Sequence, residues 1–325
     1  MNQKIEISSK TIIFTVFFLI SLKALWLIRE LIFSLFLAFI FMSALKPPVN
    51  YLEKKIFPRS LAVFFVFLMT VAAVLFTGSF VVPPLVRESM AFFRSLPALI
   101  TNNFSTPSSY LNLEPLTSFL PDLTQNFVKF ISSVFSNFIF FLSIVVFTFY
   151  FLLEEKFLQK ILEKFLEEKQ AEKIVAISDE AERRMGAWVW GELILMTVIG
   201  IMSYGGLSLL RIKYVLPLAI IAGILEIVPI IGPTISTIPA FFVAISSSWF
   251  LGLSVIALYF IIQQLENNLI VPLVMKKAVG LNPIVTLIAL TIGGKLGGFL
   301  GIFLSVPAAL LLETILIGLT KVKRL

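Results

Sequence analysis

The stretch Tyr214–Ile245 reads YVLPLAIIAGILEIVPIIGPTISTIPAFFVAI, and its only charged side chain is that of Glu226. It holds 32 residues, whereas one plain membrane-spanning helix needs roughly 20 and two helices need about 40. Four prolines fall inside it, and proline interrupts the hydrogen-bond ladder of a helix. We therefore expect two short helices, separated by a break near Pro229, that enter the membrane partway and return. Such a break survives at membrane depth only where protein or a wet cavity surrounds it.

A second apolar stretch near the C-terminus has the same character. Pro283–Gly318 holds 36 residues, and glycines cluster in its middle around one lysine, Lys295. Glycine weakens a helix and lets two backbones approach closely. We interpret this stretch as a second helical hairpin or a broken helix. The expected breaks of the two hairpins lie at Pro229, Gly232, Pro233, Gly293, Gly294, Gly297 and Gly298.

Six further apolar runs are predicted to be membrane spans. They are Thr11–Ile28, Leu31–Leu45, Ser60–Val82, Ile131–Leu153, Trp188–Leu210 and Trp249–Pro272. Prolines are expected to end the second run at Pro47-Pro48 and the third at Pro83-Pro84, and Gly205-Gly206 is expected to interrupt the fifth. The predicted fold class is all-α: a polytopic transmembrane helix bundle of about eight membrane segments, two of them broken or re-entrant helical hairpins.

The composition agrees with a membrane protein and excludes most other classes. Apolar residues make up 58% of the 325 residues and charged residues only 14%, against about 25% charged in soluble domains. The sequence has no Cys and no His, so it carries no disulfide, no thiolate or imidazole metal site and no Ser-His-Asp triad. The net charge of +7 is dispersed between apolar runs, which is typical of basic cytoplasmic loops and not of a nucleic-acid interface.

Charge and proline patterns divide the chain into three parts. Residues 1–153 hold four predicted spans and, at 84–130, a polar insert that we expect to form short amphipathic helices on the extracytoplasmic face. Residues 154–186 form a charged helical connector, in which Glu and Lys alternate with apolar residues at helical spacing. Residues 187–325 form the transport core, with hairpins at 214–245 and 283–318.

The distribution of basic residues predicts the orientation in the membrane. With the N-terminus inside, eighteen Lys and Arg residues fall on the cytoplasmic side and six on the other side. Cytoplasmic loops carry such an excess. Both termini and the charged connector are therefore expected in the cytoplasm. This topology requires each hairpin to return to the side from which it enters.

Six ionisable residues fall inside the apolar runs, where each costs roughly 2.5–3.5 kcal/mol on insertion scales and is expected to face the bundle interior. Glu226 lies at the expected break of the first hairpin, where freed carbonyls and helix ends form ion sites in transporters. Its carboxylate can bind a cation or carry a proton, or it can cap the broken helix as a structural group. The full set is Lys23, Glu192, Glu226, Glu266, Lys295 and Glu313.

Glu266 lies in the segment QQLENN, within an apolar run. An α-helix places Gln263, Glu266 and Asn267 on one face, which is expected to meet a polar cavity, a substrate or another subunit. Interhelical hydrogen bonding is the alternative. Lys295 is expected to neutralise one of the glutamates, to bind an anionic group, or to snorkel to the surface. The predicted substrate- or ion-binding residues are Glu226, Glu266, Asn267, Asn268, Gln263 and Lys295.

Three motifs stand out in the second half of the chain. They are Gly223-Ile-Leu-Glu226-Ile-Val-Pro229-Ile-Ile-Gly232-Pro233, Gln263-Gln264-Leu-Glu266-Asn267-Asn268-Leu-Ile-Val-Pro272, and Gly280-Leu-Asn-Pro283 followed by Gly293-Gly294-Lys295-Leu-Gly297-Gly298. Jointly they resemble signatures of the autoinducer-2 exporter (AI-2E) family of membrane transporters. The resemblance implies about eight membrane segments, a bacterial inner membrane and a homo-oligomer such as a pentamer. It leaves the substrate open between a small polar signal that is exported and sodium or lithium that is exchanged for protons.

We expect secondary transport, because the chain has no G-x-x-x-x-G-K-[ST] loop with which to bind and hydrolyse ATP. The expected mechanism is alternating access around the two hairpins, with proton or sodium coupling through Glu226 and Glu266. A passive oligomeric channel for small solutes or ions is the alternative, and an enzyme is disfavoured. No cofactor, metal or nucleic acid is expected. The expected partners are the lipid bilayer, a small polar solute or H+/Na+, and further copies of the chain.

Overall fold

The computed structural model describes residues 9–103, 138–154, 156–228, 231–275 and 281–322, and every regular element in these ranges is a helix. The first half of the chain forms α1 (Ser9–Leu27), α2 (Arg29–Lys55), α3 (Arg59–Asn103), α5 (Phe138–Leu153) and α6 (Phe157–Phe165). The second half forms α7 (Glu168–Leu209), α8 (Val215–Leu225), α9 (Ile231–Ile245), α10 (Trp249–Leu265), the π-helix η1 (Glu266–Ile270), α11 (Val271–Met275) and α12 (Pro283–Val322).

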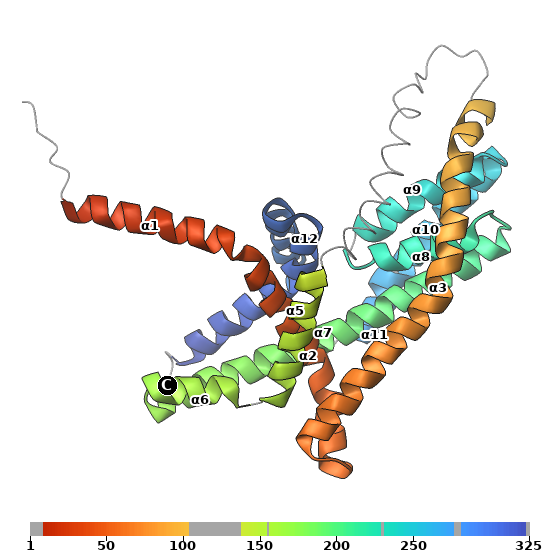
Figure 1. The fold of residues 1–325 in the computed structure, drawn as a ribbon. Helices are drawn as coiled ribbons and strands as arrows, with labels where there is room; N and C mark the ends of the chain where they lie inside the picture. The colour runs from red at the N-terminus through yellow and green to blue at the C-terminus, as the bar shows by residue number, and fades with distance from the viewer. Residues whose placement is uncertain (1–8, 104–137, 155, 229–230, 276–280, 323–325) are drawn as a thin grey trace, which may run out of the picture.

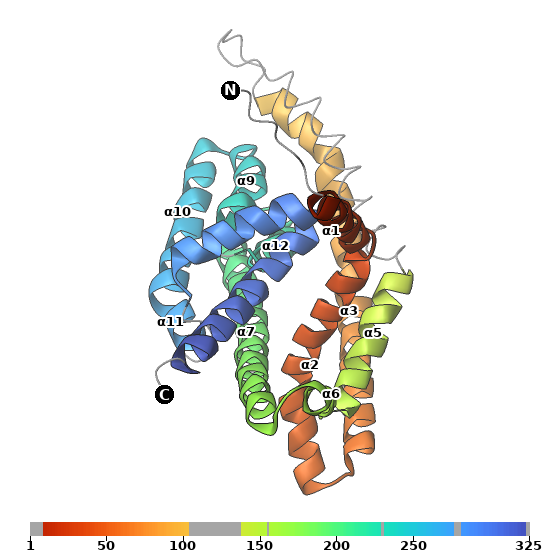
Figure 2. The same ribbon diagram turned by 90° about the vertical axis from the view of Figure 1, so that its left-hand side faces the viewer.

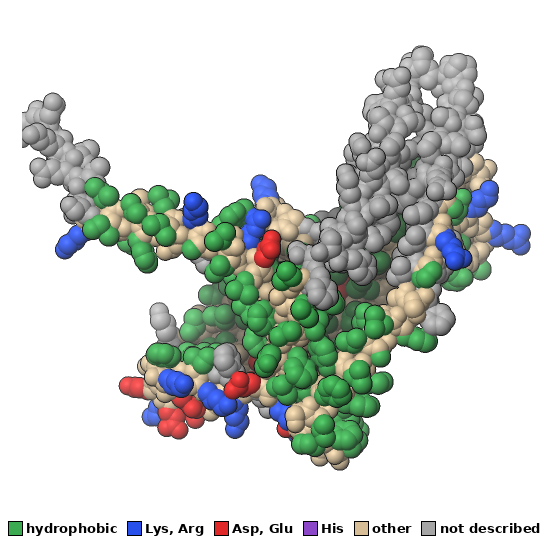
Figure 3. Space-filling model, in the orientation of Figure 1, with side chains coloured by type: hydrophobic (Ala, Val, Ile, Leu, Met, Phe, Trp, Pro, Cys, Tyr) green, Lys and Arg blue, Asp and Glu red, His purple; other side chains and the backbone are tan. Residues whose placement is uncertain are grey.

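Several of these helices have the length and composition of membrane spans. Shorter apolar helices accompany them, and large apolar side chains cover much of the outer surface (Figure 3). Lipid tails can solvate such a surface, whereas water cannot. The predicted all-α, polytopic membrane bundle is therefore confirmed. Within the described ranges, the helices long and apolar enough to cross a membrane are Arg29–Lys55, Arg59–Ser79, Glu168–Leu209, Trp249–Met275 and Leu300–Thr320.

Helix α7 is the central element of the bundle. In Figure 2, α2, α3 and α5 lie on one side of α7 and α10 lies on the other side, while α9 packs against α8 and α10. Helix α8 packs along α7, and α12 also contacts it. Helix α1 projects away from the rest (Figure 1), with most of its described side chains exposed. Charged side chains gather around α6 and the start of α7, at the lower left of Figure 3, and we call residues 154–184 the charged end.

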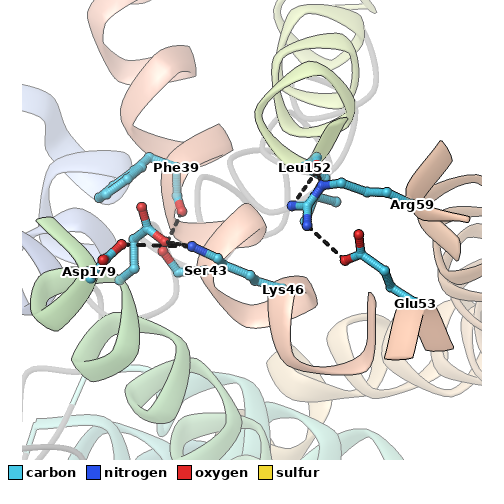
Figure 4. A network of polar contacts seen from close by, with 8 residues as sticks. Phe39, Ser43, Lys46, Glu53, Arg59, Leu152 and Asp179 are labelled. Atoms are coloured by element: carbon cyan, nitrogen blue, oxygen red, sulfur yellow. Dashed lines mark hydrogen bonds and ion pairs between the residues drawn. The ribbon is translucent and has the colours of Figure 1, made fainter. Parts of the chain in front are cut away.

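Polar contacts join four helices near the charged end (Figure 4). Lys46 of α2 donates a hydrogen bond to Glu182 of α7 at 2.6 Å. At the start of α3, Arg59 pairs with Glu53 of α2 at 3.0 Å and donates two hydrogen bonds to the carbonyl of Leu152 on α5. These contacts join the end of α2, the start of α3, the end of α5 and the first part of α7 to one another.

Helix α2 does not end at Pro47-Pro48, as the sequence predicts, but continues through both prolines to Lys55. Pro48 has no N–H with which to reach the carbonyl of Ala44, four residues earlier. That carbonyl instead accepts a hydrogen bond from the indole Nε1 of Trp190 on α7, at 3.0 Å. The predicted short span Leu31–Leu45 is therefore wrong, because a neighbouring helix supplies the donor that proline lacks.

We expect Trp190→Phe to destabilise the protein by about 1–3 kcal/mol, because the carbonyl of Ala44 then loses its partner. In a Pro48→Ala background, Trp190→Phe should cost only the lost packing of the indole ring. The alanine at position 48 has an N–H, which can donate to the carbonyl of Ala44 in place of Trp190. A double-mutant cycle of unfolding free energies measures the difference. Equal costs of Trp190→Phe in the two backgrounds would contradict this explanation.

Two further predicted interruptions are absent from the described residues. Helix α3 runs through Pro83-Pro84 to Asn103, so the described part of the predicted insert at 84–130 continues this helix beyond the candidate span Arg59–Ser79; residues 104–130 lie outside the described residues. Membrane helices tolerate prolines where local adjustment satisfies the freed carbonyls.

Helix α7 also continues where an interruption is predicted: it runs through Gly205-Gly206 to Leu209. Glycine costs a helix only about 1 kcal/mol, and Gly206 leaves room for Leu258 of α10.

Both predicted helix breaks are found. Helix α8 ends at Leu225 and α9 begins at Ile231, while Pro229, between them, lies outside the described residues. Gly232 lies so close to the carbonyl of Leu225 that a Cβ atom would overlap it. A side chain at this position would therefore force the two arms of the hairpin apart.

The second break divides α12 at Gly298. This residue has φ 57° and ψ −134°, a conformation that residues with a Cβ rarely adopt. The two halves of α12 then cross with Gly293 and Gly301 in backbone contact, and a Cβ on either glycine would overlap the other. The glycine cluster therefore provides both the reversal of the chain and the space in which the two halves pack.

Candidate functional site

Three glutamates from three helices converge where α7, α8 and α10 meet. Glu192 lies on α7, Glu226 follows the last residue of α8, and Glu266 begins η1. They are 4%, 1% and 2% exposed, respectively. The carboxyl groups of Glu226 and Glu266 interact directly, and electrostatic interactions link Glu192 to both. We call Glu192, Glu226 and Glu266 the carboxyl cluster.

The carboxyl cluster has few partners. Both carboxyl oxygens of Glu192, one of Glu226 and one of Glu266 are buried without a hydrogen bond among the described residues. Between residues 187 and 275 the only basic residues are Arg211 and Lys213, in the turn between α7 and α8. A buried charge without a partner costs several kcal/mol. The cluster is therefore stable only when its carboxyl groups are protonated or hold cations.

Close helix packing brings the carboxyl cluster together. Gly223 of α8 lies against Gly200 of α7, and a Cβ at position 223 would approach the carbonyl of Met196 to 2.7 Å. Gly191, next to Glu192, lies against Met275 of α11. The break after α8 then sets Glu226 at the tip of the hairpin formed by α8 and α9. Small residues at the helix contacts thus allow three acidic residues to meet.

In the QQLENN segment, Glu266 continues the buried face of α10 that carries Tyr259 and Ile262. A π-helical turn holds more residues than an α-helical turn, so η1 shifts the face on which the following side chains lie. Glu266 is buried, Gln263 is half-buried, and Asn267 and Asn268 are exposed. The prediction that Gln263, Glu266 and Asn267 share one face is therefore wrong. Asn268 donates a hydrogen bond to the carbonyl of Gln264, within its own helix.

The other ionisable residues of the apolar runs lie away from the carboxyl cluster. Lys295 is exposed on α12 and takes no part in the electrostatic interactions of the three glutamates. The structure therefore does not place Lys295 where it would neutralise Glu226 or Glu266. Glu313 of α12 forms an ion pair with Arg184 of α7. Lys23 is exposed on α1.

The sequence prediction of the site omits Glu192. A signal for this residue exists, because Glu192 is the only charge between residues 187 and 210. The prediction also omits Ser203 and Tyr259, whose hydroxyl groups are buried without hydrogen-bond partners among the described residues. Nothing in the sequence marks these two, since serine and tyrosine are ordinary residues of membrane helices.

The carboxyl groups of the cluster can hold either protons or cations. Among the described residues, no three acidic, His or Cys side chains have the geometry of a preformed metal site. The contact between Glu226 and Glu266 instead requires a proton, because two carboxylates this close cannot both be ionised. The oxygens that hold this proton are those that would hold a cation. Binding of one therefore competes with binding of the other.

Comparison with known proteins agrees with the motifs. The AI-2E family transporter model matches residues 12–321. YueF of Bacillus subtilis (strain 168) is 27% identical over 320 residues, which cover 92% of this chain and 86% of YueF. PerM of Escherichia coli (strain K12) is 29% identical over 143 residues, which cover 42% of this chain and 39% of PerM. The first is provisionally named as a transport protein and the second as a permease. The chain therefore belongs to the AI-2E family of membrane transporters.

Proposed function

We propose that this protein is a secondary transporter that exchanges a monovalent cation, such as sodium or lithium, for protons. The carboxyl cluster is the binding site that the two ions share. Membership of a transporter family supports transport across a membrane. One observation carries the finer proposal: three buried carboxyl groups have unpartnered oxygens, and no basic side chain takes part in their described interactions.

The chemistry of the cluster favours a cation over a neutral polar solute. Ionised carboxylates only accept hydrogen bonds, whereas a polyhydroxylated signal also carries acceptors and needs donors from its binding site. Hard cations need only oxygen ligands. A site built from three carboxyl groups is therefore matched to cations, and export of a small polar signal remains the rival substrate assignment.

The hairpin formed by α8 and α9 supplies a means of alternating access. Glu226 lies at its tip, while Glu192 and Glu266 lie on the helices around it. A shift of the hairpin relative to α7 and η1 would separate Glu226 from Glu266 and open the cluster to one side. Broken helices carry ion sites in transporters of this kind.

Transport by purified protein in proteoliposomes tests the proposal. With an imposed pH gradient, sodium or lithium should enter as protons leave, the rate should saturate, and external cation should drive counter-transport. Neutral polar solutes should not be carried. Uptake of a neutral solute without dependence on cations would overturn the cation assignment, and a flux that never saturates would favour the oligomeric channel.

We also propose that both termini and the charged end lie in the cytoplasm of a bacterial inner membrane. The eighteen-to-six split of basic residues supports this orientation. Gln170→Cys, at an exposed position of the charged end, should be labelled by an impermeant thiol reagent only from the cytoplasmic side. Ser247→Cys, at an exposed position between α9 and α10, should be labelled only from outside. The reverse pattern would refute the orientation, and the absence of native cysteine keeps the background clean.

Assembly into a homo-oligomer, such as a pentamer, is a further part of the proposal. The amides of Gln264, Asn267 and Asn268 are exposed on an otherwise apolar helix, where lipid offers no hydrogen-bond partner. The same amides on a second copy can both donate and accept, so they would satisfy one another. Light scattering in nanodiscs and mild detergents should report an oligomer, and a monomer in every condition would contradict it.

A further inference from the structure

A second buried polar pair lies between α7 and α10, apart from the carboxyl cluster. Ser203 of α7 and Tyr259 of α10 are 0% and 3% exposed. Their hydroxyl groups approach each other, yet neither completes a hydrogen bond with a described residue. We call Ser203 and Tyr259 the hydroxyl pair. Buried polar groups are almost always hydrogen-bonded, so two unpartnered hydroxyls at one place call for an explanation.

Helix geometry aligns the hydroxyl pair with the carboxyl cluster. Ser203 follows Glu192 by about three turns of α7, or about 16 Å, and Tyr259 precedes Glu266 by about two turns of α10, or about 10 Å. Because both separations are close to whole numbers of helical turns, Ser203 lies on the same face of α7 as Glu192, and Tyr259 lies on the same face of α10 as Glu266. Both displacements lead toward the end of the bundle where α7 finishes and α10 begins.

Apolar side chains separate the two polar groups of residues. Ile199 of α7 and Ile262 of α10 lie along the same faces, between the glutamates and the hydroxyls, and both are buried in one apolar cluster with Tyr259. Beyond the hydroxyl pair, α7 and α10 stay in contact where Leu258 fills the space left by Gly206. The hydroxyl pair is thus an isolated polar position within an apolar helix interface.

We propose that the hydroxyl pair is a second station on the ion path, between the carboxyl cluster and the end of the bundle at which α7 finishes. This inference rests on the proposed cation–proton exchange. A hydroxyl oxygen can coordinate a cation that has lost its water, and a hydroxyl group can accept a hydrogen bond while donating another. Ile199 and Ile262 are buried between the two stations, so an ion that passes from one station to the other would have to displace these side chains.

Removal of the hydroxyl oxygens tests the inference. Tyr259→Phe and Ser203→Ala should each lower the rate of cation–proton exchange by at least about tenfold, the loss expected when one polar partner of a charged species is removed. The melting temperature should change little, because neither hydroxyl completes a hydrogen bond that the deletion would remove. Tyr204→Phe and Ser208→Ala remove the same atoms from exposed positions of α7 and should transport as the wild type does.

Cation-induced stabilisation separates this inference from the proposed function. If the carboxyl cluster binds sodium or lithium, either salt raises the melting temperature of the wild type above that in choline chloride. The hydroxyl variants should keep this rise while they lose transport. Variants that transport at the wild-type rate, or that lose transport together with thermal stability, would overturn the second station and leave the cluster as proposed. A wild type that neither responds to these salts nor transports them would overturn the proposed function itself.

Discussion

Glu226→Gln and Glu266→Gln should each abolish cation–proton exchange and leave the folded protein intact. Glutamine keeps the length and one acceptor oxygen of glutamate, and its amide can donate to the neighbouring carboxyl group as a protonated glutamate does. A structural cap at the hairpin tip would therefore tolerate the change. An exchange site would not, because the titratable proton and the negative charge that attracts the cation are both lost. We expect rates at least about tenfold below the wild type.

Controls distinguish loss of chemistry from loss of protein. Glu172→Gln, at an exposed position of the charged end, makes the same chemical change outside the carboxyl cluster and should leave transport unchanged. Membrane expression, oligomer size and melting temperature should match the wild type in every variant. The wild-type rate should depend on pH, because protons compete with cations for the cluster. Exchange at the wild-type rate with unchanged pH dependence in both variants would mean that the carboxyl groups are structural, and the channel would become the better proposal.

Glu192→Gln extends this prediction to the glutamate that the predicted set of binding residues omits. Both of its carboxyl oxygens are buried without a hydrogen bond among the described residues. No hydrogen bond in the described part of the chain therefore supports a purely structural role for Glu192. We expect altered coupling, measured as cations moved per proton. An unchanged ratio would remove Glu192 from the site and leave Glu226 and Glu266 as a pair.

The fold could be predicted from the sequence wherever local features decide it. Apolar length gives the membrane helices, and clusters of proline and glycine mark both hairpin breaks, because the responsible residues lie within the element itself. The end of α2 could not be predicted in this way. Whether Pro48 stops the helix depends on Trp190 of α7, which lies far along the chain. Only the packing of α7 against α2 brings that donor to the carbonyl of Ala44.

The same distinction applies to the candidate site. An acidic residue in an apolar run is conspicuous, so Glu226 and Glu266 could be named as candidates from sequence. Their contact depends on how the end of α8 packs against the start of η1, which brings together residues from two separate helices. Lys295 shows the converse. Its charge is equally conspicuous, yet the α12 hairpin leaves it exposed.

Gly301→Ala should destabilise the protein by about 3 kcal/mol or more, at the upper end of the cost of overpacking. A Cβ at position 301 would overlap the carbonyl of Gly293, and the atoms that must move are backbone atoms of the same hairpin. A flexible side chain could move aside, but the two halves of α12 can only separate. Separation would also weaken the contacts of α12 with α7, so we expect a lower melting temperature and a lower yield of folded protein in detergent.

Gly205→Ala provides a control of opposite sign. A Cβ at position 205 of α7 would meet no heavy atom within 4 Å, and glycine within a helix is less stable than alanine by roughly 0.5–1 kcal/mol. This variant should therefore be more stable than the wild type, as judged by the same melting curves. If glycines in these helices served only to loosen the backbone, both changes would stabilise the protein. If only Gly301→Ala loses stability, glycine is required at position 301 because a Cβ does not fit between the two halves of α12. Equal stability of the two variants would mean that the halves of α12 do not cross in backbone contact.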